Sequence, residues 1–476
     1  MRIINLILLL LIVFLFSCGK GLKLADETTS TSYLPFAVQF GSVTASGDAT
    51  AFDQASGYHI DNDGNSYNTG FTWGSLFEAN ISGAFQGDVF VTKTNINGQV
   101  EWSTQLGNVT VGANSNQSDI CNDISTDSNG NVYCVGSTTG NLGEANAGSG
   151  DAFVVKLNKN GALQWTTQLG ATSAPGNASG DDTCHTIHID ENDNIFCGGS
   201  TTGALGEANA GSNDAFILKL NTSGAIQWLT HFGATTGTGA RNNAERCWGV
   251  ATDSSGSVYC TGPTTSSFGD TIDGSGNRDT FLLKVNSSGV FQWVTQLGTT
   301  NAPGSSTAKD DGNDLLVDSN DNIFVLIATE GSLNEANGGS QDIAIAKFDT
   351  SGSLTWVKQF GNVTSPVRSS GDDECYSLAE DLESNIVCIG STTGSFAETN
   401  GGGADILIIS IDQDGNEVKS LQYGAVTKFE NTDQNDYCYA GGFDKHGNFY
   451  CGGTTYSDFG EARGGSGDIF TIRASF

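Results

Sequence analysis

Short apolar and alternating runs, separated by turn residues, recur along the chain with a fixed period. One period contains four such runs, at residues 122–126, 132–137, 152–157 and 163–169. Tight Asn/Asp-Gly turns join the first run to the second, at residues 127–131, and the third to the fourth, at 158–161. Runs of this length bounded by such turns are typical of β-hairpins. The pattern therefore predicts four short strands, A to D, in every repeat.

An Asp that opens the third run marks the period. It stands at Asp88, Asp151, Asp214, Asp279, Asp342, Asp405 and Asp468, so every spacing is 63 residues except one of 65. Fourteen residues after the marker, five copies carry a Trp and the sixth carries Lys419: Trp102, Trp165, Trp228, Trp293 and Trp356. Four strands per repeat in seven copies indicate a β-propeller.

The two ends of the repeat region complement each other. The seventh copy stops after its third strand, and residues 36–41 near the other end match the fourth strand at 165–170. Closing a ring in this way removes an open sheet edge. We therefore expect an all-β fold: a single seven-bladed β-propeller over residues 34–476, with four antiparallel strands per blade and the last blade completed by the N-terminal strand. An open solenoid is the alternative, and it does not explain the complementary half-blades.

Two motifs carry a resemblance to a known family. They are the Asp-x-x-Gly-Asn-x-Tyr/Phe-x-x-Gly-x-Thr hairpin, as at residues 127–138, and the Gly-x-x-x-Trp-x-x-Gln-x-Gly strand, as at 161–170. Over about residues 34–476 the chain resembles the bacterial seven-bladed β-propeller repeat (SBBP-type) lipoproteins. The resemblance implies a fold and an exported setting, and no particular activity. The second motif also resembles the tryptophan-docking motif of quinone-cofactor propellers. The chain shows no distinctive cofactor residue beside it, so we interpret the five Trp as core residues that pack blade against blade.

Residues 1–17 have the pattern of a lipoprotein signal peptide. Arg2 precedes an apolar run from Ile3 to Phe16, which is short for a membrane span, and the run ends in Phe16-Ser17-Cys18-Gly19. This ending looks like a bacterial lipobox; an ordinary cleaved signal with a chance Cys is the alternative. We therefore predict lipidation of Cys18, a flexible tether over residues 18–33 and location in the bacterial cell envelope at the outer membrane. The periplasmic and the surface side both stay open.

The cysteines other than Cys18 fall into pairs. All five pairs are 13 residues apart, with one Cys on strand A and one on strand B: Cys121 with Cys134, Cys184 with Cys197, Cys247 with Cys260, Cys375 with Cys388, and Cys438 with Cys451. The two remaining blades carry Ala55 with Asn68 and Gly312 with Val325 at these positions, so both partners are present or both are absent. Partners across a hairpin are within reach of a disulfide. We predict five disulfides, each within one blade, rather than a thiolate metal site, because no Cys-x-x-Cys cluster occurs.

The charge of the chain narrows its partners. With 20 Lys+Arg against 53 Asp+Glu, the formal net charge is −33. Such a chain lacks the basic surface that nucleic acid requires, and we expect contact with a membrane only through the lipid anchor.

Acids gather in the long D–A and B–C loops, which an up-and-down strand order puts on one face. Six acids stand just before strand A: Asp119, Asp182, Glu245, Asp311, Asp373 and Asp436. Five more lie in the B–C loops: Glu144, Glu207, Glu335, Glu398 and Glu461. The first six are our candidates for Ca²⁺ or for a cationic partner, because carboxylate oxygens suit hard cations. Solvated acids that keep the protein soluble are the interpretation that the pattern favours.

Other chemistry has little support in the sequence. The Asp-rich turns at residues 61–65 and 412–416 lack the bidentate Glu of an EF-hand, so turn chemistry explains them better. The five His share no repeat column, and strand alternation places His185 and His188 on opposite faces, which argues against a metal site. The sequence shows no nucleophile elbow and no phosphate-binding loop.

Variable loops on a rigid scaffold are a usual place for recognition. We therefore expect a non-enzymatic envelope lipoprotein, monomeric and without a cofactor other than Ca²⁺ at the candidate acids. Its partner would be a protein or a glycan, bound on the long-loop face. A carbohydrate-active lyase or hydrolase and a structural envelope component are the alternatives.

Overall fold

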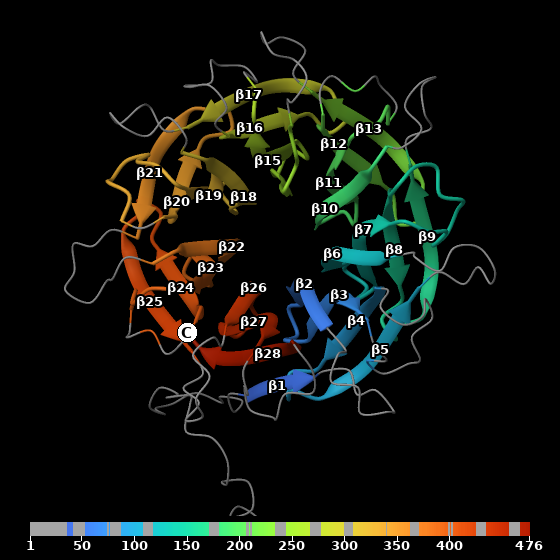
Figure 1. The fold of residues 1–476 in the computed structure, drawn as a ribbon, viewed down its shortest axis with the longest axis horizontal. Helices are drawn as coiled ribbons and strands as arrows, with labels where there is room; N and C mark the ends of the chain where they lie inside the picture. The colour runs from blue at the N-terminus through green and yellow to red at the C-terminus, as the bar shows by residue number, and fades with distance from the viewer. Residues whose placement is uncertain are drawn as a thin grey trace, which may run out of the picture.

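The structure is a computed structural model in which seven four-stranded antiparallel sheets form a ring around a central opening (Figure 1). It describes residues 36–40, 53–73, 76, 87–107, 118–170, 180–205, 209, 212–233, 244–266, 278–298, 308–338, 340–361, 371–397, 400, 403–424, 435–456 and 467–476. The predicted all-β, seven-bladed propeller is confirmed. The described residues include no helix with the length and apolar character to cross a membrane.

Each sheet is a blade whose four strands run from the centre of the ring outward, in the predicted order A to D. The innermost A strands are β2 (Asp53–Ile60), β6 (Asp119–Thr126), β10 (Asp182–Ile189), β14 (Gly249–Thr252), β18 (Asp310–Val317), β22 (Asp373–Glu380) and β26 (Asp436–Phe443). The B strands are β3 (Ser66–Thr72), β7 (Val132–Thr138), β11 (Ile195–Thr201), β15 (Val258–Thr264), β19 (Ile323–Thr329), β23 (Ile386–Thr392) and β27 (Asn448–Thr455).

The two outer positions of each blade follow the same scheme. The C strands are β4 (Asp88–Thr94), β8 (Asp151–Leu157), β12 (Asp214–Leu220), β16 (Asp279–Val285), β20 (Asp342–Phe348), β24 (Asp405–Ile411) and β28 (Asp468–Ser475). The D strands are β5 (Val100–Leu106), β9 (Leu163–Leu169), β13 (Ile226–Phe232), β17 (Phe291–Leu297), β21 (Leu354–Phe360), β25 (Glu417–Tyr423) and, for the last blade, β1 (Phe36–Phe40).

The hydrophobic core lies between neighbouring blades. Tyr133, Val135 and Val154 of the second blade form one buried cluster with Phe216 and Leu218 of the third. The B and C strands are therefore covered on both faces, which explains why they read as almost continuous apolar runs rather than as alternating ones.

In the five blades that carry it, the Trp of the D strand packs against the next blade. Trp165 donates a hydrogen bond from Nε1 to the Thr222 carbonyl oxygen at 3.2 Å, in the β12–β13 turn of the following blade. Its indole packs on Gly224, where an added Cβ would come within 2.9 Å of the ring and where φ is +83°. The indole is partly buried rather than fully enclosed. The predicted blade-to-blade packing is confirmed, and the turn requires glycine for both space and backbone conformation.

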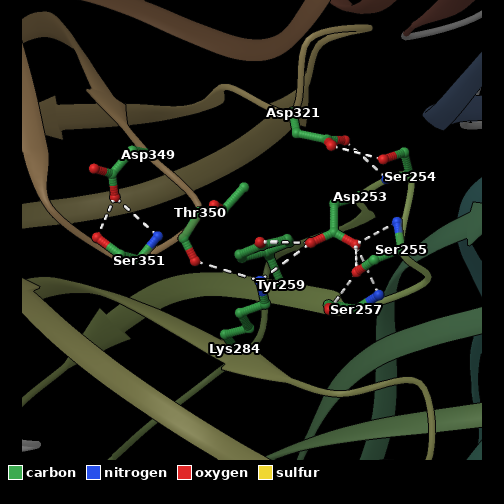
Figure 2. A network of polar contacts seen from close by, with 10 residues as sticks. All are labelled: Asp253, Ser254, Ser255, Ser257, Tyr259, Lys284, Asp321, Asp349, Thr350 and Ser351. Atoms are coloured by element: carbon green, nitrogen blue, oxygen red, sulfur yellow. Dashed lines mark hydrogen bonds and ion pairs between the residues drawn. The ribbon is translucent and has the colours of Figure 1, made fainter.

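An Asp organises each short A–B turn on the face opposite the long loops. Figure 2 shows Asp253, whose Oδ1 accepts hydrogen bonds from the amides of Ser255 and Ser257 at 3.0 and 2.9 Å, and whose Oδ2 accepts the Tyr259 hydroxyl at 2.8 Å. Lys284 reaches Oδ2 of the same carboxylate at 3.1 Å. The blades are clasped here as well, because Ser254 donates to Asp321 of the next blade through both its amide and its hydroxyl.

The Asp-rich turns that resemble Ca²⁺ loops use the same chemistry. Oδ1 of Asp61 accepts the amides of Asp63 and Asn65, each at 2.9 Å. Oδ1 of Asp412 accepts those of Asp414 and Asn416 at 3.0 and 2.8 Å. Turn chemistry therefore accounts for both segments, as predicted.

The N-terminal strand completes the last blade. β1 pairs antiparallel with β28 from Phe36↔Arg473 to Phe40↔Ile469, at the outer edge of the sheet (Figure 1). Gln39 donates from Nε2 to Asp468 at 2.8 Å, and Gln168 makes the same contact with Asp151 at 2.9 Å inside the second blade. The chain ends thus reproduce a bond that other blades form within one continuous segment.

The five predicted disulfides are present, with Cα–Cα distances of 5.7–6.0 Å. In chain order, Cys121 is bonded to Cys134, Cys184 to Cys197, Cys247 to Cys260, Cys375 to Cys388, and Cys438 to Cys451.

The half-cystines are diagonal neighbours rather than the direct cross-strand partners that the sequence suggests. Cys121 faces Gly136, and Cys134 faces Ile124. In the same way Cys197 faces Ile187, Cys388 faces Leu378 and Cys451 faces Gly441. A β-bulge follows the first Cys in each of these four blades, as between Cys121 and Asp123.

Candidate ligand-binding channel

The acids proposed as Ca²⁺ ligands are mostly buried strand-end residues. Five of the six have exposed fractions of 0–3%: Asp119, Asp182, Glu245, Asp373 and Asp436. Four of these accept a hydrogen bond from the Thr that ends strand B, the partners being Thr138, Thr264, Thr392 and Thr455. These bonds fasten strands A and B at the long-loop end. The described residues contain no group of three or more His, Cys, Asp or Glu that could hold a metal ion, and Ca²⁺ binding stays a prediction.

The sixth candidate, Asp311, does not belong to this column. Thr329 donates to Asp310 at 2.6 Å, so Asp310 has the strand-end role, and Asp53 has it in the first blade with Thr72 at 2.5 Å. Asp311 follows and pairs with Arg278 at 2.6 Å. The sequence has two adjacent acids here, Asp310 and Asp311, and they follow the one repeat spacing of 65 rather than 63 residues. The sequence alone therefore did not show which of the two belongs to the strand-end column.

Other predicted positions divide between exposed and undescribed residues. Glu144 and Glu335 are exposed in their B–C loops. Cys18, Glu207, Glu398 and Glu461 lie outside the described residues.

A channel of about 510 Å³ runs along the axis of the ring and is lined by residues from all seven blades. Its wall is made of the innermost strands, six of which contain a β-bulge near their start, as between Cys184 and Thr186. A bulge adds one unpaired residue, which changes the direction of the side chains that follow. In each case the bulged residue lines the channel.

The bulged residues, with Trp248 at the matching place in the fourth blade, form what we call the bulge ring. Its members are Ser56, Asn122, His185, Trp248, Asn313, Tyr376 and Tyr439. Tyr376 and Tyr439 are in edge-to-face contact, with ring centroids 5.4 Å apart. Aromatic rings and amides that converge on one cavity are typical of small-ligand sites.

A second ring lies two residues earlier, towards the long loops, and we call it the mouth ring. It consists of Gln54, Ile120, Thr183, Arg246, Asp311, Glu374 and Tyr437. The two rings contact each other, since Tyr437 stacks on Tyr439 with an interplanar angle of 9° and a centroid separation of 6.0 Å. On the seventh blade, aromatic side chains therefore continue from the bulge ring to the mouth ring.

Asp123 and Asp314 join blades at the channel wall. The Asp123 carboxylate accepts its neighbour's amide, from Ile124 at 2.8 Å, and that of Ile187 in the next blade at 2.9 Å. Asp314 does the same with the amides of Leu315 and Leu378 at 2.8 and 2.9 Å. Burial raises the pKa of Asp123 to about 6 and that of Asp314 to about 7, although these hydrogen bonds oppose the rise.

Two interpretations of the histidines were wrong: that His185 and His188 lie on opposite faces, and that no two histidines share a repeat column. His185 and His188 both line the channel, because the bulge at His185 cancels the expected alternation. His59 and His188 also share a repeat column: each binds through Nε2 the Thr that ends the next innermost strand, Thr126 at 3.0 Å and Thr252 at 2.9 Å. Burial lowers the pKa of all three imidazoles to about 4.

The acids of the mouth ring are perturbed in the opposite direction. Burial raises the pKa of Glu374, and the nearby charge of Asp311 adds to the rise, while hydrogen bonds from Tyr376, Gln341 and Asn313 lower it. Burial likewise raises the pKa of Asp311, although the positive charges of Arg278 and Lys309 oppose this. Perturbed carboxyl groups in a concave, aromatic site are typical of ligand-binding or catalytic positions.

Sequence reasoning did not identify these two rings. The signal was present, because the strand-end Asp, the Cys and the Trp recur from blade to blade, whereas the channel-facing columns differ in almost every blade. Residues that stabilise the blade recur from blade to blade. The columns that do not recur are therefore the better candidates for functional positions.

Comparison with known proteins identifies the repeat. A family model described as the SBBP beta-propeller repeat matches residues 101–144, 164–207 and 292–326. No curated protein matches the chain.

Solved structures resemble the chain at a distance. A polysaccharide lyase, an ulvan lyase, is 10% identical over 92% of this chain and 96% of its own, with a TM-score of 0.47. An α-L-arabinofuranosidase of Fusarium graminearum is 9% identical over 82% and 98%, with a TM-score of 0.40. A protein of unknown function from Bacteroides caccae is 11% identical over 71% and 92%, with a TM-score of 0.38. Similarity at this level says nothing about the activity of the present chain.

Proposed function

We propose, for a chain built of SBBP beta-propeller repeats, that the protein is a non-enzymatic envelope lipoprotein that binds a partner at the mouth of its central channel. The partner class is a protein or a glycan, and the geometry favours a glycan. In this proposal Cys18 carries the acyl anchor, and the propeller presents its long-loop face to the partner.

The bulge ring is the observation that supports this proposal most. His185, Trp248, Tyr376 and Tyr439 line a polar channel of about 510 Å³. Aromatic faces pack on the apolar faces of sugar rings, while amides and carboxylates bind the hydroxyl groups at their edges. Asn122 and Asn313 each direct their side-chain NH₂ to a carbonyl oxygen of the next blade, Cys184 at 2.8 Å and Cys375 at 3.2 Å, so the wall of the site is held in place.

Binding of defined oligosaccharides to the soluble Cys18→Ala protein tests the proposal. The panel contains cello-, xylo-, galacto- and galacturono-oligosaccharides, measured by calorimetry. The double variant Tyr376→Ala with Tyr439→Ala should weaken the best ligand by about tenfold or more, because it removes two stacking surfaces. Phe291→Ala is the matched control, since this aromatic side chain is 47% exposed on an outer strand. The glycan assignment is rejected if no saccharide in the panel binds, or if the control weakens binding as much as the double variant.

A carbohydrate-active enzyme is the second candidate, and one observation favours it. Asp311 and Glu374 lie on adjacent blades in the mouth ring and interact electrostatically, and the pKa of each is raised. Two interacting carboxyl groups of unequal surroundings are the usual equipment of glycoside hydrolysis. Release of new reducing ends from the same oligosaccharides, abolished by Glu374→Gln, would establish the enzyme. Binding without turnover would establish the lectin-like function, and a structural envelope component would show neither.

A further inference from the structure

Arg246 is unusual among the basic residues of this protein. It is the one Lys or Arg in the mouth ring and bulge ring, although the chain holds 53 acids that could neutralise it. The described part of the chain offers it no ion pair, whereas Arg278 pairs with Asp311 at 2.6 Å and Lys309 pairs with Glu330 at 2.9 Å. A guanidinium group left unpaired in so acidic a protein remains available to an external anion.

The backbone around Arg246 departs from the repeat. β14 begins only at Gly249 and has four residues, while the other six innermost strands have eight. In place of a regular start, the Cys247 amide donates to Gly199 of the preceding blade at 3.2 Å. The Trp248 amide donates to Thr261 at 2.8 Å, and the Cys247–Cys260 disulfide fixes the segment. The irregular segment is therefore well anchored, and it carries Arg246 and Trp248 together.

Arg246, Trp248 and His185 form what we call the recognition corner, on the third and fourth blades. Its positive charge acts on His185 and, after burial, is the second cause that lowers the pKa of that imidazole. His185 is therefore neutral at pH 7 and accepts or donates a hydrogen bond with Ser200 at 2.9 Å. Trp248 lines the channel beside it. The corner combines one cation, one indole face and one neutral imidazole.

We infer that this corner binds the carboxylate of an acidic sugar, with Arg246 as the ligand of the carboxylate and Trp248 as the stacking surface. The inference rests on the proposed glycan-binding function and assigns its ligand class. A guanidinium presents two parallel N–H groups, which match the two oxygens of a carboxylate. Glu374 lies on the sixth blade, away from this corner, and as a carboxylate it would repel an acidic group placed beside it. The neutral tyrosines of the sixth and seventh blades can instead bind sugar hydroxyl groups.

A matched pair of probes tests the inference. Tetragalacturonate and its fully methyl-esterified form share one backbone, and they differ in whether each carboxyl group is a charged carboxylate or a neutral methyl ester. Calorimetry on the soluble Cys18→Ala protein should show that the acid form binds at least about tenfold more tightly. Arg246→Gln should abolish this preference, and Arg246→Lys should retain only a part of it, because Lys keeps the charge and loses the planar fork.

Lys159→Gln is the matched control for charge. It makes the same change of net charge in the β8–β9 turn on the opposite face, where Lys159 is exposed, and it should leave the preference unchanged. Equal binding of acid and ester, or a preference that survives Arg246→Gln, overturns the inference while leaving glycan binding intact. If neither probe nor any neutral oligosaccharide binds at about 1 mM, the proposed function fails, and the inference fails with it.

Discussion

At the residue scale, an acidic side chain has one role at a position that recurs in every blade and another role at a position that differs among blades. The strand-end acids, such as Asp373 and Asp436, accept a Thr hydroxyl and are nearly inaccessible to solvent. Glu374, the next residue in the chain after Asp373, interacts with Tyr376 and Asn313 of the bulge ring, and burial raises its pKa. One step along a strand therefore separates an acid that holds two strands together from one that interacts with the bulge ring.

His188 gives the structure a testable pH dependence. Its pKa is about 4 in the folded state, below the ordinary value of 6.5, so the unfolded chain takes up a proton first as the pH falls. The stability that it contributes is complete above about pH 6.5 and is lost as the pH falls towards 4. When the pH falls from 7 to 5, the unfolding free energy of the parent protein should decrease by about 1–2 kcal/mol more than that of His188→Gln.

Denaturant unfolding at the two pH values checks this expectation, and differences between variants isolate the histidine. The raised pKa values of Asp123 and Asp314 act in the opposite sense, because their stabilising contribution is present at low pH and is lost as the pH rises through about 6 and 7. His446→Gln, in the exposed β26–β27 turn, is the control. An equal loss in parent and His188→Gln would show that His188 does not titrate as its surroundings require.

At the element scale, strand positions, hairpin turns and disulfides could be predicted from the sequence because every blade repeats them. The β-bulges could not, because no residue type marks them: the bulged position holds Ser56, Asn122 or Tyr439 without loss of the bulge. Without the bulges, alternation assigned His185 and His188 to opposite faces and kept the bulge ring out of view. The late start of β14, after Arg246–Trp248, also depends on contacts between blades, such as the Cys247–Gly199 hydrogen bond, which local sequence does not reveal.

The disulfides should reinforce hairpins that form without them. The blades that lack one place Ala55 and Asn68, or Gly312 and Val325, at the same positions and keep the four-stranded sheet. We expect the double variant Cys184→Ala with Cys197→Ala, in the soluble protein, to fold with the same circular dichroism spectrum and to lose about 1–3 kcal/mol of unfolding free energy. The value is below the full loop-entropy figure, because the hairpin already holds its ends together. Failure of the double variant to fold would show that the disulfide is required to form the blade.

At the scale of the whole molecule, closure of the ring depends on five residues. β1 supplies the outer strand of the last blade and repeats the Gln–Asp contact through Gln39 and Asp468. A chain that begins at residue 41 should expose the edge of β28, aggregate, and lose about 4 kcal/mol or more of stability. A chain that begins at residue 34 removes the predicted tether and keeps β1, so it should remain monodisperse and as stable as the parent. Equal stability of the two truncations, measured by size-exclusion chromatography and thermal unfolding, would contradict closure by β1.

Ring closure also explains the location of the proposed site. Figure 1 shows seven copies of one scaffold arranged around a single axis. A column that varies among the blades therefore becomes a ring of diverse side chains around the channel. The variation of the long loops is visible in the sequence, and it led to the prediction of a binding site on the long-loop face. The innermost strands vary in a comparable way, but only the arrangement of the blades around a channel shows that the varying residues lie together.

Hydroxyl-radical footprinting of the soluble Cys18→Ala protein, read by mass spectrometry with and without tetragalacturonate, tests the central claim most directly. If ligand binding occurs in the channel, oxidation of Trp248, Tyr376 and Tyr439 should fall by about half or more at saturating ligand, while the outer-strand Phe291 is unchanged. Protection confined to the long loops, with the three channel residues oxidised as before, would contradict the claim.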